Sequence, residues 1–489
     1  MAFLALPLWF AAAAALCLAL ARSPILARRL GYGAAALGGA GCLVGSLGLL
    51  GSGAAPSLLL VQTTPSFALA LRADALSAAF ALALGAATTA VSIAAIGYGR
   101  HYDAHGGARL AALYNLFVAT MLLVLLADGA FSFLIAWEAM SLVGYLLVAH
   151  EHEQAEVRRA GFVYLAMAHL GTAFVVGALF WLLTGAPSVD FAGLAGGAAA
   201  LGPLARDAIF LALLIGFGTK AGLAPLHVWL PRAHPVAPSH VSALMSGVML
   251  KVALYGLIRL AFVVLGAGPP WWGWLLLATG LLSALLGVLY ALVDRDLKRV
   301  LAYSSVENVG IVAIGLGVAL VAPGAIGALA LTAALFHALN HALFKSLLFV
   351  GAGAVDQAVG SRDLDRLGGL ARAMPTTSAL FLVGALAIAA VPPLNGFASE
   401  WLTFQALLGL GTLGGASAVA AGVAAALLAL TGGLSVACFV RAFGVPFLGI
   451  PRAGLRPRGD GPASTRAGLA LLAAGCVGLG LLPGLAPDL

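Results

Sequence analysis

The stretch Leu211–Pro225, LALLIGFGTKAGLAP, decides the fold class because it is apolar enough for a membrane interior yet carries a lysine and a helix break. About 20 apolar residues are needed to cross a bilayer. Lys220 is followed here by Gly222 and Pro225, and a proline leaves helical carbonyls without their usual partners. A second interruption, VPPLNG at 391–396, divides another apolar run. We expect two broken transmembrane helices, with a simple proline kink as the alternative.

The whole chain has the composition of an integral membrane protein. Of its 489 residues, 62% are hydrophobic and 9% are charged, whereas soluble domains carry roughly 25% charged residues. Composition therefore excludes a soluble fold and predicts an all-α polytopic membrane protein. About fourteen transmembrane helices are expected, centred near residues 11, 40, 83, 119, 139, 170, 218, 249, 282, 310, 339, 392, 428 and 475.

The 25 Lys and Arg residues are distributed unevenly between alternate loops. Nineteen fall on one side, from Arg22 to Arg466, three on the other (Arg72, Arg206 and Arg259) and three inside spans. Because cytoplasmic loops carry the positive excess, both termini are expected to be extracytoplasmic in a prokaryotic plasma (inner) membrane. The net charge of +7 therefore reflects topology and not a nucleic-acid surface. The first span has its basic residues after the apolar run, which favours a retained helix over a signal peptide.

The order of the broken spans predicts an internal repeat. They are the seventh and the twelfth, so helices 4–8 and 9–13 are expected to form two five-helix repeats. An odd number of helices makes such repeats inverted, as in secondary transporters. The expected organisation is one integral domain at 1–489, with N-terminal helices 1–3 at 1–100, repeats at 110–265 and 271–447, and helix 14 at 465–486.

Six charged side chains fall well inside the expected spans. Each costs about 2.5 to 3.5 kcal/mol at a helix centre, so they must be paired, hydrated or functional. A lysine beside a carboxylate can take up or release a proton, whereas an arginine keeps its proton. Three lysines and three glutamates therefore favour a proton relay, although mutual neutralisation fits the same counts. The six are Glu138, Lys220, Lys251, Glu307, Lys345 and Glu400.

Histidines accompany two of these lysines. His337, His341 and Lys345 recur every four residues, which stacks them along one helix face. His240 and Lys251 are eleven residues apart, close to three turns of an ideal helix, so they are expected to share a face. Histidines satisfied within the core are the alternative. Metal binding by His337 and His341 lacks a third ligand nearby, and no metal is expected.

The sequence leaves open the roles of two glutamates and of one polar loop cluster. Glu138 lies near the middle of its span and needs a partner such as Lys220. Glu307 lies about two turns from the charged loop at 294–299, so a structural salt bridge fits as well as a relay role. The cluster at 150–156 has the composition of a metal or proton-entry site, but we expect a solvated loop.

Other features point away from a cofactor in this chain. There is no GxxxxGK[ST] phosphate loop, and the glycines near residue 351 lie in an apolar span and not after a strand. The cysteines lie in apolar runs without a CxxC pair, which indicates small hydrophobic residues. They are Cys17, Cys42, Cys438 and Cys476.

Four segments carry a resemblance to a known family. GTKAGLAPLHVWLPRAHPVAPSHVSALMSG (218–247) and LFHALNHALFKSLLFVGAG (335–353) resemble the antiporter-like family shared by complex I, multisubunit sodium/proton antiporters and membrane-bound hydrogenases. SSVENVG (304–310) and PPLNGFASEWLTFQAL (392–407) are most similar to the large membrane subunit of hydrogenase 4 and formate hydrogenlyase. The resemblance covers nearly the whole chain and implies a fourteen-helix core with discontinuous seventh and twelfth helices.

The resemblance also implies a function. It implies a proton-translocating, non-redox subunit of a hydrogenase-4, formate hydrogenlyase or NADH:quinone oxidoreductase type of complex, with no cofactor of its own. Its partners would be other membrane subunits and a peripheral redox arm. Relatives often continue beyond the core, whereas this chain stops at Leu489, so a lateral helix is not expected. The implied path has a Glu138 and Lys220 pair, Lys251 as central link, Lys345 passing protons towards Glu400, and His240, His337 and His341 bridging by water.

Two other functions remain open on the sequence. A sodium/proton antiporter subunit could use the same carboxylates. An inert membrane scaffold that anchors a peripheral redox arm would carry the charges for helix packing alone. Replacing a buried lysine with methionine separates a relay from a scaffold.

Overall fold

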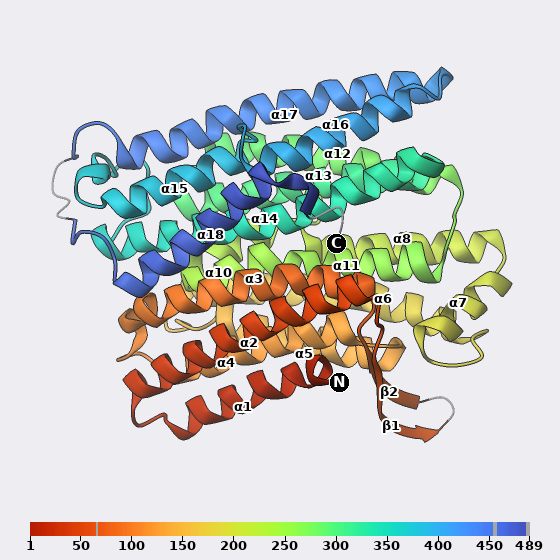
Figure 1. Ribbon diagram of the computed structural model, residues 1–489, viewed down its shortest axis with the longest axis horizontal. Helices are drawn as coiled ribbons and strands as arrows, with labels where there is room; N and C mark the ends of the chain where they lie inside the picture. Colours follow the sequence, from red (N-terminus) through yellow and green to blue (C-terminus); the bar gives the residue numbers. More distant parts are fainter. Residues whose placement is uncertain (65–66, 453–456, 486–489) are drawn as a thin grey trace. The chain divides into compact units, whose positions relative to one another are not determined.

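The computed structural model describes residues 1–64, 67–452 and 457–485, and this part of the chain is mostly helical (Figure 1). Arg456, one of the basic loop residues counted above, and Leu489 lie outside the described residues. Contacts between helices divide the chain into two compact units. Unit 1 comprises 1–89, 102–222 and 248–268, and unit 2 comprises 90–101, 223–247 and 269–489.

Unit 1 is built from long helices and one hairpin. The antiparallel hairpin of β1 (Ser57–Thr64) and β2 (Phe67–Arg72) pairs Ser57 with Arg72. Helix α3 (Ala75–Tyr98) belongs to this unit up to Thr89. The other helices are η1 (Ala2–Ala5), α1 (Leu6–Ala19), α2 (Pro24–Ser52), α4 (Gly107–Leu126), α5 (Ala130–Val148), α6 (Ala155–Leu183), α7 (Phe191–Ala200), α8 (Pro203–Ala221), α11 (Leu250–Leu257) and the π-helical η4 (Ile258–Val264).

Unit 2 holds the longest helices of the chain. Helices α12, α13 and α14 pack in sequence, and α16 and α17 pack beside them (Figure 1). The helices are η2 (Gly99–Tyr102), α9 (Leu230–Val236), α10 (Ser239–Leu244), α12 (Pro270–Val293), α13 (Leu297–Val321), α14 (Gly324–Val359), η5 (Leu370–Arg372), α15 (Pro375–Ile388), α16 (Asn395–Gly411), α17 (Gly415–Phe447), α18 (Ala463–Leu481) and η6 (Pro483–Leu485).

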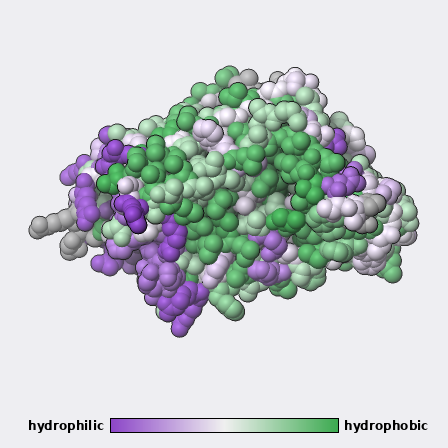
Figure 2. All heavy atoms as spheres, turned by 90° about the horizontal axis from the view of Figure 1, so that it is seen from below, coloured by the Kyte–Doolittle hydropathy of each residue, from purple (hydrophilic) through white to green (hydrophobic). Residues whose placement is uncertain are grey.

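The helical membrane fold expected from the sequence is confirmed. In the described part, twelve helices are long and apolar enough to cross a membrane. Helix α8 and the pair α15 and α16 lie at the positions of the other two expected spans, and residue 392 falls on the break between α15 and α16. Figure 2 shows apolar side chains over most of the face that it draws. The inverted five-helix repeats and the residue ranges given to them stay predictions.

Both interruptions are present. Helix α8 ends at Ala221, Gly222 adopts a positive φ of 84°, and no α-helix resumes until Leu230. Glycine tolerates this left-handed conformation because it has no Cβ. Within unit 2, the freed N–H of Ala224 donates to the hydroxyl of Ser283 on α12 at 2.9 Å. The break is therefore stabilised by a side chain and is not a simple kink.

The second break lies between α15 and α16. Ala390 adopts a positive φ of 51°, and α16 begins at Asn395. The side-chain amide of Asn340 on α14 donates to the carbonyl of Asn395 at 2.8 Å, and the Asn395 amide donates back to Asn340 Oδ1 at 3.1 Å. A Cβ on Gly396 would lie 1.8 Å from the Ala387 carbonyl oxygen, so this close approach requires glycine.

The run Ser239–Val264 corrects two expectations. Met245–Met249 is π-helical, and this wider turn changes the direction of the side chains that follow. The ideal α-helical spacing assumed between His240 and Lys251 is therefore wrong. Arg259, expected in a loop, instead lies in the π-helical η4 and is buried.

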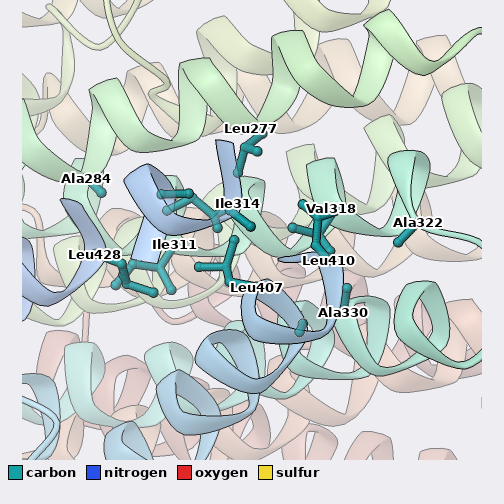
Figure 3. Packing of buried hydrophobic residues seen from close by; sticks show 13 residues of the cluster. Leu277, Ala284, Ile311, Ile314, Val318, Ala322, Ala330, Leu407, Leu410 and Leu428 are labelled. Carbon is teal, nitrogen blue, oxygen red and sulfur yellow. The ribbon is translucent and has the colours of Figure 1, made fainter. Parts of the chain in front are cut away.

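The apolar core of unit 2 lies between α12, α13, α16 and α17. Leu277, Ile314, Leu407 and Leu428 meet there, as Figure 3 shows. Helices α12 and α13 approach closely, since a Cβ on Gly280 would lie 2.7 Å from the backbone nitrogen of Ile314. Small residues permit such packing between membrane helices.

Candidate functional site

The buried lysine of unit 1 is bound by neutral groups. Lys220 occupies the last turn of α8, directly before the break. Its ammonium donates to the hydroxyl of Ser141 at 2.9 Å and to that of Tyr164 at 3.0 Å, and it lies 4.8 Å from the centre of the Tyr164 ring. Tyr164 in turn donates to the sulfur of Met249 at 3.6 Å. These groups hold the lysine without neutralising its charge.

Glu138 stands one turn before Ser141 on α5 and interacts electrostatically with Lys220. Its ion-pair contact, however, is with a residue that sequence reasoning missed. Glu138 Oε2 lies 3.5 Å from Nε2 of His169 on α6. A lone histidine on an apolar helix has no periodic signal, so only the packing of α5 against α6 reveals it.

Close packing of α6 and α8 fixes the position of Lys220. A Cβ on Gly171 would lie 2.9 Å from the carbonyl oxygen of Gly216, and one on Gly216 would lie 2.6 Å from a methyl group of Val175. The two backbones therefore nearly touch, four residues before the lysine. This contact brings the Lys220 ammonium to Tyr164 of α6.

Unit 1 contains a second buried lysine and a buried arginine. Lys251 lies on α11 and is almost fully enclosed. One turn later, the hydroxyl of Tyr255 donates to the carbonyl of Leu125 at 3.0 Å. The guanidinium of Arg259 binds both carboxylate oxygens of Asp74 at 2.6 Å. Arg259 is thus a paired, permanently charged group.

In unit 2, Lys345 of α14 has the same kind of surroundings as Lys220. Its ammonium donates to the hydroxyl of Ser304 on α13. Glu307, one turn further along α13, is buried and interacts electrostatically with Lys345. A lysine, a neutral hydroxyl and a carboxylate again form one cluster.

The charged residues of the loop at 294–299 pair with residues other than Glu307. Asp294 pairs with Arg299 at 3.2 Å, and Arg295 pairs with Asp365 at 2.9 Å. The carboxylate of Asp296 lies 3.2 Å from Arg362, and Lys298 donates to the Ala237 carbonyl at 2.9 Å. Glu307 is instead buried and interacts electrostatically with Lys345.

Glu400 lies in the second turn of α16 and is largely buried. It interacts electrostatically with Glu307 and lines a cavity of about 370 Å³ together with Trp401 and Gly432. The cavity lies between α16 and α17, where glycines leave room beside the carboxylate. Unit 2 therefore brings Glu307, Lys345 and Glu400 together.

The predicted row of His337, His341 and Lys345 lies along α14. The rings of His337 and His341 are stacked with centroids 6.4 Å apart, and Lys345 follows one turn later. His337 Nε2 lies 3.2 Å from the amide oxygen of Asn308, and Nδ1 lies 3.0 Å from the hydroxyl of Ser399. His337 thus connects α13 with α16 by hydrogen bonds.

Comparison with known proteins agrees with this architecture. Residues 127–428 match the family described as NADH:quinone oxidoreductase/Mrp antiporter, TM. The chain belongs to this family.

Three curated relatives are similar over much of the chain. Hydrogenase-4 component B of Escherichia coli is 44% identical over 404 residues, 81% of this chain and 60% of the relative. Formate hydrogenlyase subunit 3 of the same organism is 38% identical over 384 residues, 77% of this chain and 61% of the relative. An Na(+)/H(+) antiporter subunit of Alkalihalophilus pseudofirmus is 36% identical over 307 residues, 60% of this chain and 37% of the relative. The chain therefore spans less than two thirds of each relative.

Two solved structures share the fold. A chain of the Mrp complex from Dietzia sp. DQ12-45-1b gives a TM-score of 0.83 at 22% identity, covering 100% of this chain and 96% of that one. A chain of respiratory complex I from Thermus thermophilus gives a TM-score of 0.82 at 23% identity, covering 99% and 96%. At these identities the likeness concerns the fold.

The remaining histidine predicted for the path, His240, belongs to unit 2. Its ring lies edge-on to that of Tyr98, with centroids 5.3 Å apart. The backbone N–H of Ser239 donates to the Tyr98 hydroxyl at 3.2 Å. Lys251 belongs to unit 1, so the two residues expected to share a helix face fall in different compact units.

The loop cluster at 150–156 is only partly the solvated loop expected. Glu151, Glu153 and His152 are accessible, but His150 is buried against the Tyr102 ring. Burial, together with the nearby charge of Arg109, lowers the pKa of His150 to about 4. Among the described residues, no group of three His, Cys, Asp or Glu side chains could hold a metal ion.

The cysteine prediction agrees with the structure. All four are buried and free of disulfide bonds. The Sγ of Cys42 lies 3.3 Å from the carbonyl oxygen of Ala81, and that of Cys17 lies 3.5 Å from the Ala27 carbonyl. They pack as small side chains within the helix bundle.

Proposed function

We propose that this protein is a proton-translocating, non-redox membrane subunit of a redox-driven complex of the hydrogenase-4 or formate hydrogenlyase type. The family match and the two Escherichia coli relatives support this class of complex. An NADH:quinone oxidoreductase type of complex is supported by the family description and the shared fold. The electron transfer itself belongs to partner subunits.

One observation carries the proposal: each unit encloses a lysine that is held by neutral hydroxyls and stands near a carboxylate. In unit 1 the lysine is Lys220, and in unit 2 it is Lys345. Burial favours a neutral lysine, and a nearby carboxylate favours a charged one. When the carboxylate is protonated or moves away, the lysine therefore tends to release its proton, and when the charged carboxylate returns, the lysine tends to take one up. Such costly intramembrane groups mark ion pathways in membrane proteins.

The proposed path uses one cluster in each unit. Glu138 and Lys220 form the relay of unit 1, and Lys251 is the central link of the whole path. Lys345 and Glu400 form the relay of unit 2, and we add Glu307 because it is buried and interacts electrostatically with Lys345. The histidines His240, His337 and His341 bridge the relay by water, and the two five-helix repeats provide its two halves.

The energy needed to move protons across the membrane requires partner subunits. Moving one charge against 100 mV costs about 2.3 kcal/mol. The proposed relay only transfers protons, so a peripheral redox arm and other membrane subunits must supply this energy. We propose a prokaryotic plasma membrane location with both termini outside the cytoplasm, on the asymmetry of basic loops.

The test is redox-driven proton uptake by vesicles that contain the assembled complex. Lys220→Met is expected to stop uptake while the complex still assembles, because methionine fills the same space without a titratable group. Lys298→Met is the matched control, since Lys298 is also buried but binds the carbonyl of Ala237. Unchanged uptake in Lys220→Met would instead make this chain a scaffold for the redox arm.

The second candidate function is that of a sodium/proton antiporter subunit. The similarity to the Na(+)/H(+) antiporter relative of Alkalihalophilus pseudofirmus and the fold shared with an Mrp complex favour it. It predicts proton flux that depends on sodium and needs no redox donor. The same vesicles, given a sodium gradient and no reductant, distinguish the two functions.

A further inference from the structure

A polar pair lies on an outward, apolar face of unit 1. The side chain of His169 is 52% exposed, and that of Glu138 is 31% exposed. Their exposed neighbours on the same two helices are apolar: Leu170 and Phe162 on α6, and Leu142 on α5. Both helices are candidate membrane spans, and ionisable residues within such spans are by default functional.

Hydrogen bonding fixes which nitrogen of His169 exchanges protons. Nδ1 lies 2.9 Å from the carbonyl oxygen of Leu165, one turn earlier on α6. A carbonyl can only accept, so Nδ1 carries a hydrogen. In the neutral ring, Nε2 is therefore the atom that accepts a proton, and it lies 3.5 Å from Glu138 Oε2.

The surroundings of the pair contain few other charges. Glu138 Oε1 has no hydrogen-bond partner within the part of the chain that the structure describes. The helices that pack most closely against α6 are α5, α7 and α8. Helix α5 contributes Glu138 and Tyr145, and α8 contributes Lys220, which interacts with Glu138, together with Arg206 and Asp207 near its start. Helix α7 carries no titratable residue, and α6 itself carries Tyr164 and, near its start, Glu156, Arg158 and Arg159. Within the described residues, the carboxylate that lies in ion-pair contact with His169 is that of Glu138.

We propose that His169 exchanges a proton with Glu138, which would make it a relay member that the family resemblance did not supply. The proton leaves the Glu138 carboxylic acid and binds Nε2, giving a carboxylate and an imidazolium, and the reverse step returns it. This inference rests on the proposed function, because it extends the Glu138 and Lys220 relay to the surface of unit 1.

The test uses two amide substitutions that each keep one contact. His169→Gln can still donate to Glu138, and His169→Asn can still donate to the Leu165 carbonyl, but neither titrates. Both are expected to lower the initial rate of redox-driven proton uptake at least about tenfold in vesicles that contain the assembled complex.

Two further variants make the result decisive. Leu170→Gln places an amide at the neighbouring exposed position and should leave uptake unchanged. If either amide at position 169 keeps the wild-type uptake rate, His169 is structural and the inference is overturned. Lys220→Met separates the two proposals: if it stops uptake while His169→Gln does not, only the inference fails, and if neither variant lowers uptake, the proposed function fails too.

Discussion

Lys345 and Glu307 interact inside unit 2, on neighbouring helices α14 and α13, with both side chains almost completely enclosed. Their sequence positions, 38 residues apart, give no sign of this pairing. Ser304, one turn before Glu307, accepts a hydrogen bond from the same ammonium. The lysine thus has one charged and one neutral partner, which is the arrangement a proton relay needs.

Two substitutions at Lys345 distinguish the role of its positive charge from the role of its ability to release a proton. Arginine keeps the positive charge beside Glu307 but holds its proton at any accessible pH, so Lys345→Arg is expected to stop proton uptake while the complex assembles. Lys345→Met should also stop uptake and in addition destabilise the chain, by about 3 to 5 kcal/mol if Glu307 stays charged. Proton uptake and thermal unfolding in detergent measure both effects. Normal uptake by Lys345→Arg would show that this lysine does not titrate.

Gly216 tests the link between helix packing and the site. In Gly216→Val, the new Cβ would meet Val175 at 2.6 Å and the Gly171 carbonyl at 2.8 Å. Overpacking of this kind costs about 1 to 3 kcal/mol, and separation of α8 from α6 would move Lys220 away from Tyr164. Lower thermal stability and slower uptake are expected together. Gly177→Val on α6 is the control, because no atom lies within 4 Å of its Cβ position.

Asp74 neutralises Arg259. Partial burial alone would raise the pKa of Asp74, but the hydrogen bonds and charge of Arg259 outweigh it and lower that pKa to about 2. The lowered value means that the pair stabilises the fold above the unfolded pKa near 4 and loses this contribution as pH falls towards 2. At pH 7, Asp74→Asn is expected to cost about 2 kcal/mol of unfolding free energy, because Arg259 stays buried without its counter-charge.

Asp365→Asn is the control for this prediction. Asp365 pairs with Arg295 at 2.9 Å, but both side chains are more than half exposed. Exposed pairs contribute about 0 to 1 kcal/mol. Unfolding in detergent should therefore distinguish the two variants, and equal stability losses would contradict the assignment of Asp74 as the main partner of Arg259.

Because His150 is buried, we expect the free energy of unfolding to depend on pH between pH 7.5 and 5. Its pKa is lowered by burial to about 4 in the folded chain, against about 6.5 when unfolded. The unfolded state therefore binds the proton more tightly, and stability is complete above pH 6.5 and falls as pH decreases towards 4. Between pH 7.5 and 5 the loss should be about 2 kcal/mol.

His150→Phe should remove this part of the pH dependence, because phenylalanine keeps the contact with the Tyr102 ring and does not titrate. His152→Phe, at an exposed position in the same loop, should retain it. Apparent melting temperatures in detergent at pH 5 and 7.5 measure the difference. An unchanged pH dependence in His150→Phe would show that this histidine is accessible in the folded chain.

The sequence by itself determined the helical membrane fold and its two broken helices. Apolar runs long enough to cross a bilayer are encoded locally, and so are Lys220 next to Gly222 and the VPPLNG interruption. It also singled out the six charged positions, because a charge in an apolar run stands out against its neighbours. The His337, His341 and Lys345 stripe followed from helical periodicity alone.

Only the tertiary structure decided which of these groups meet. The contact of Glu138 with His169, the place of Glu307 beside Lys345 and the pairing of Arg259 with Asp74 each join different segments of the chain. The π-helical turn at Met245–Met249 likewise has no periodic signature and altered the register assumed for His240 and Lys251. The physical reason is that partners are chosen by how helices pack, through close contacts such as that of Gly171 with Gly216, and this packing depends on residues far apart in the chain.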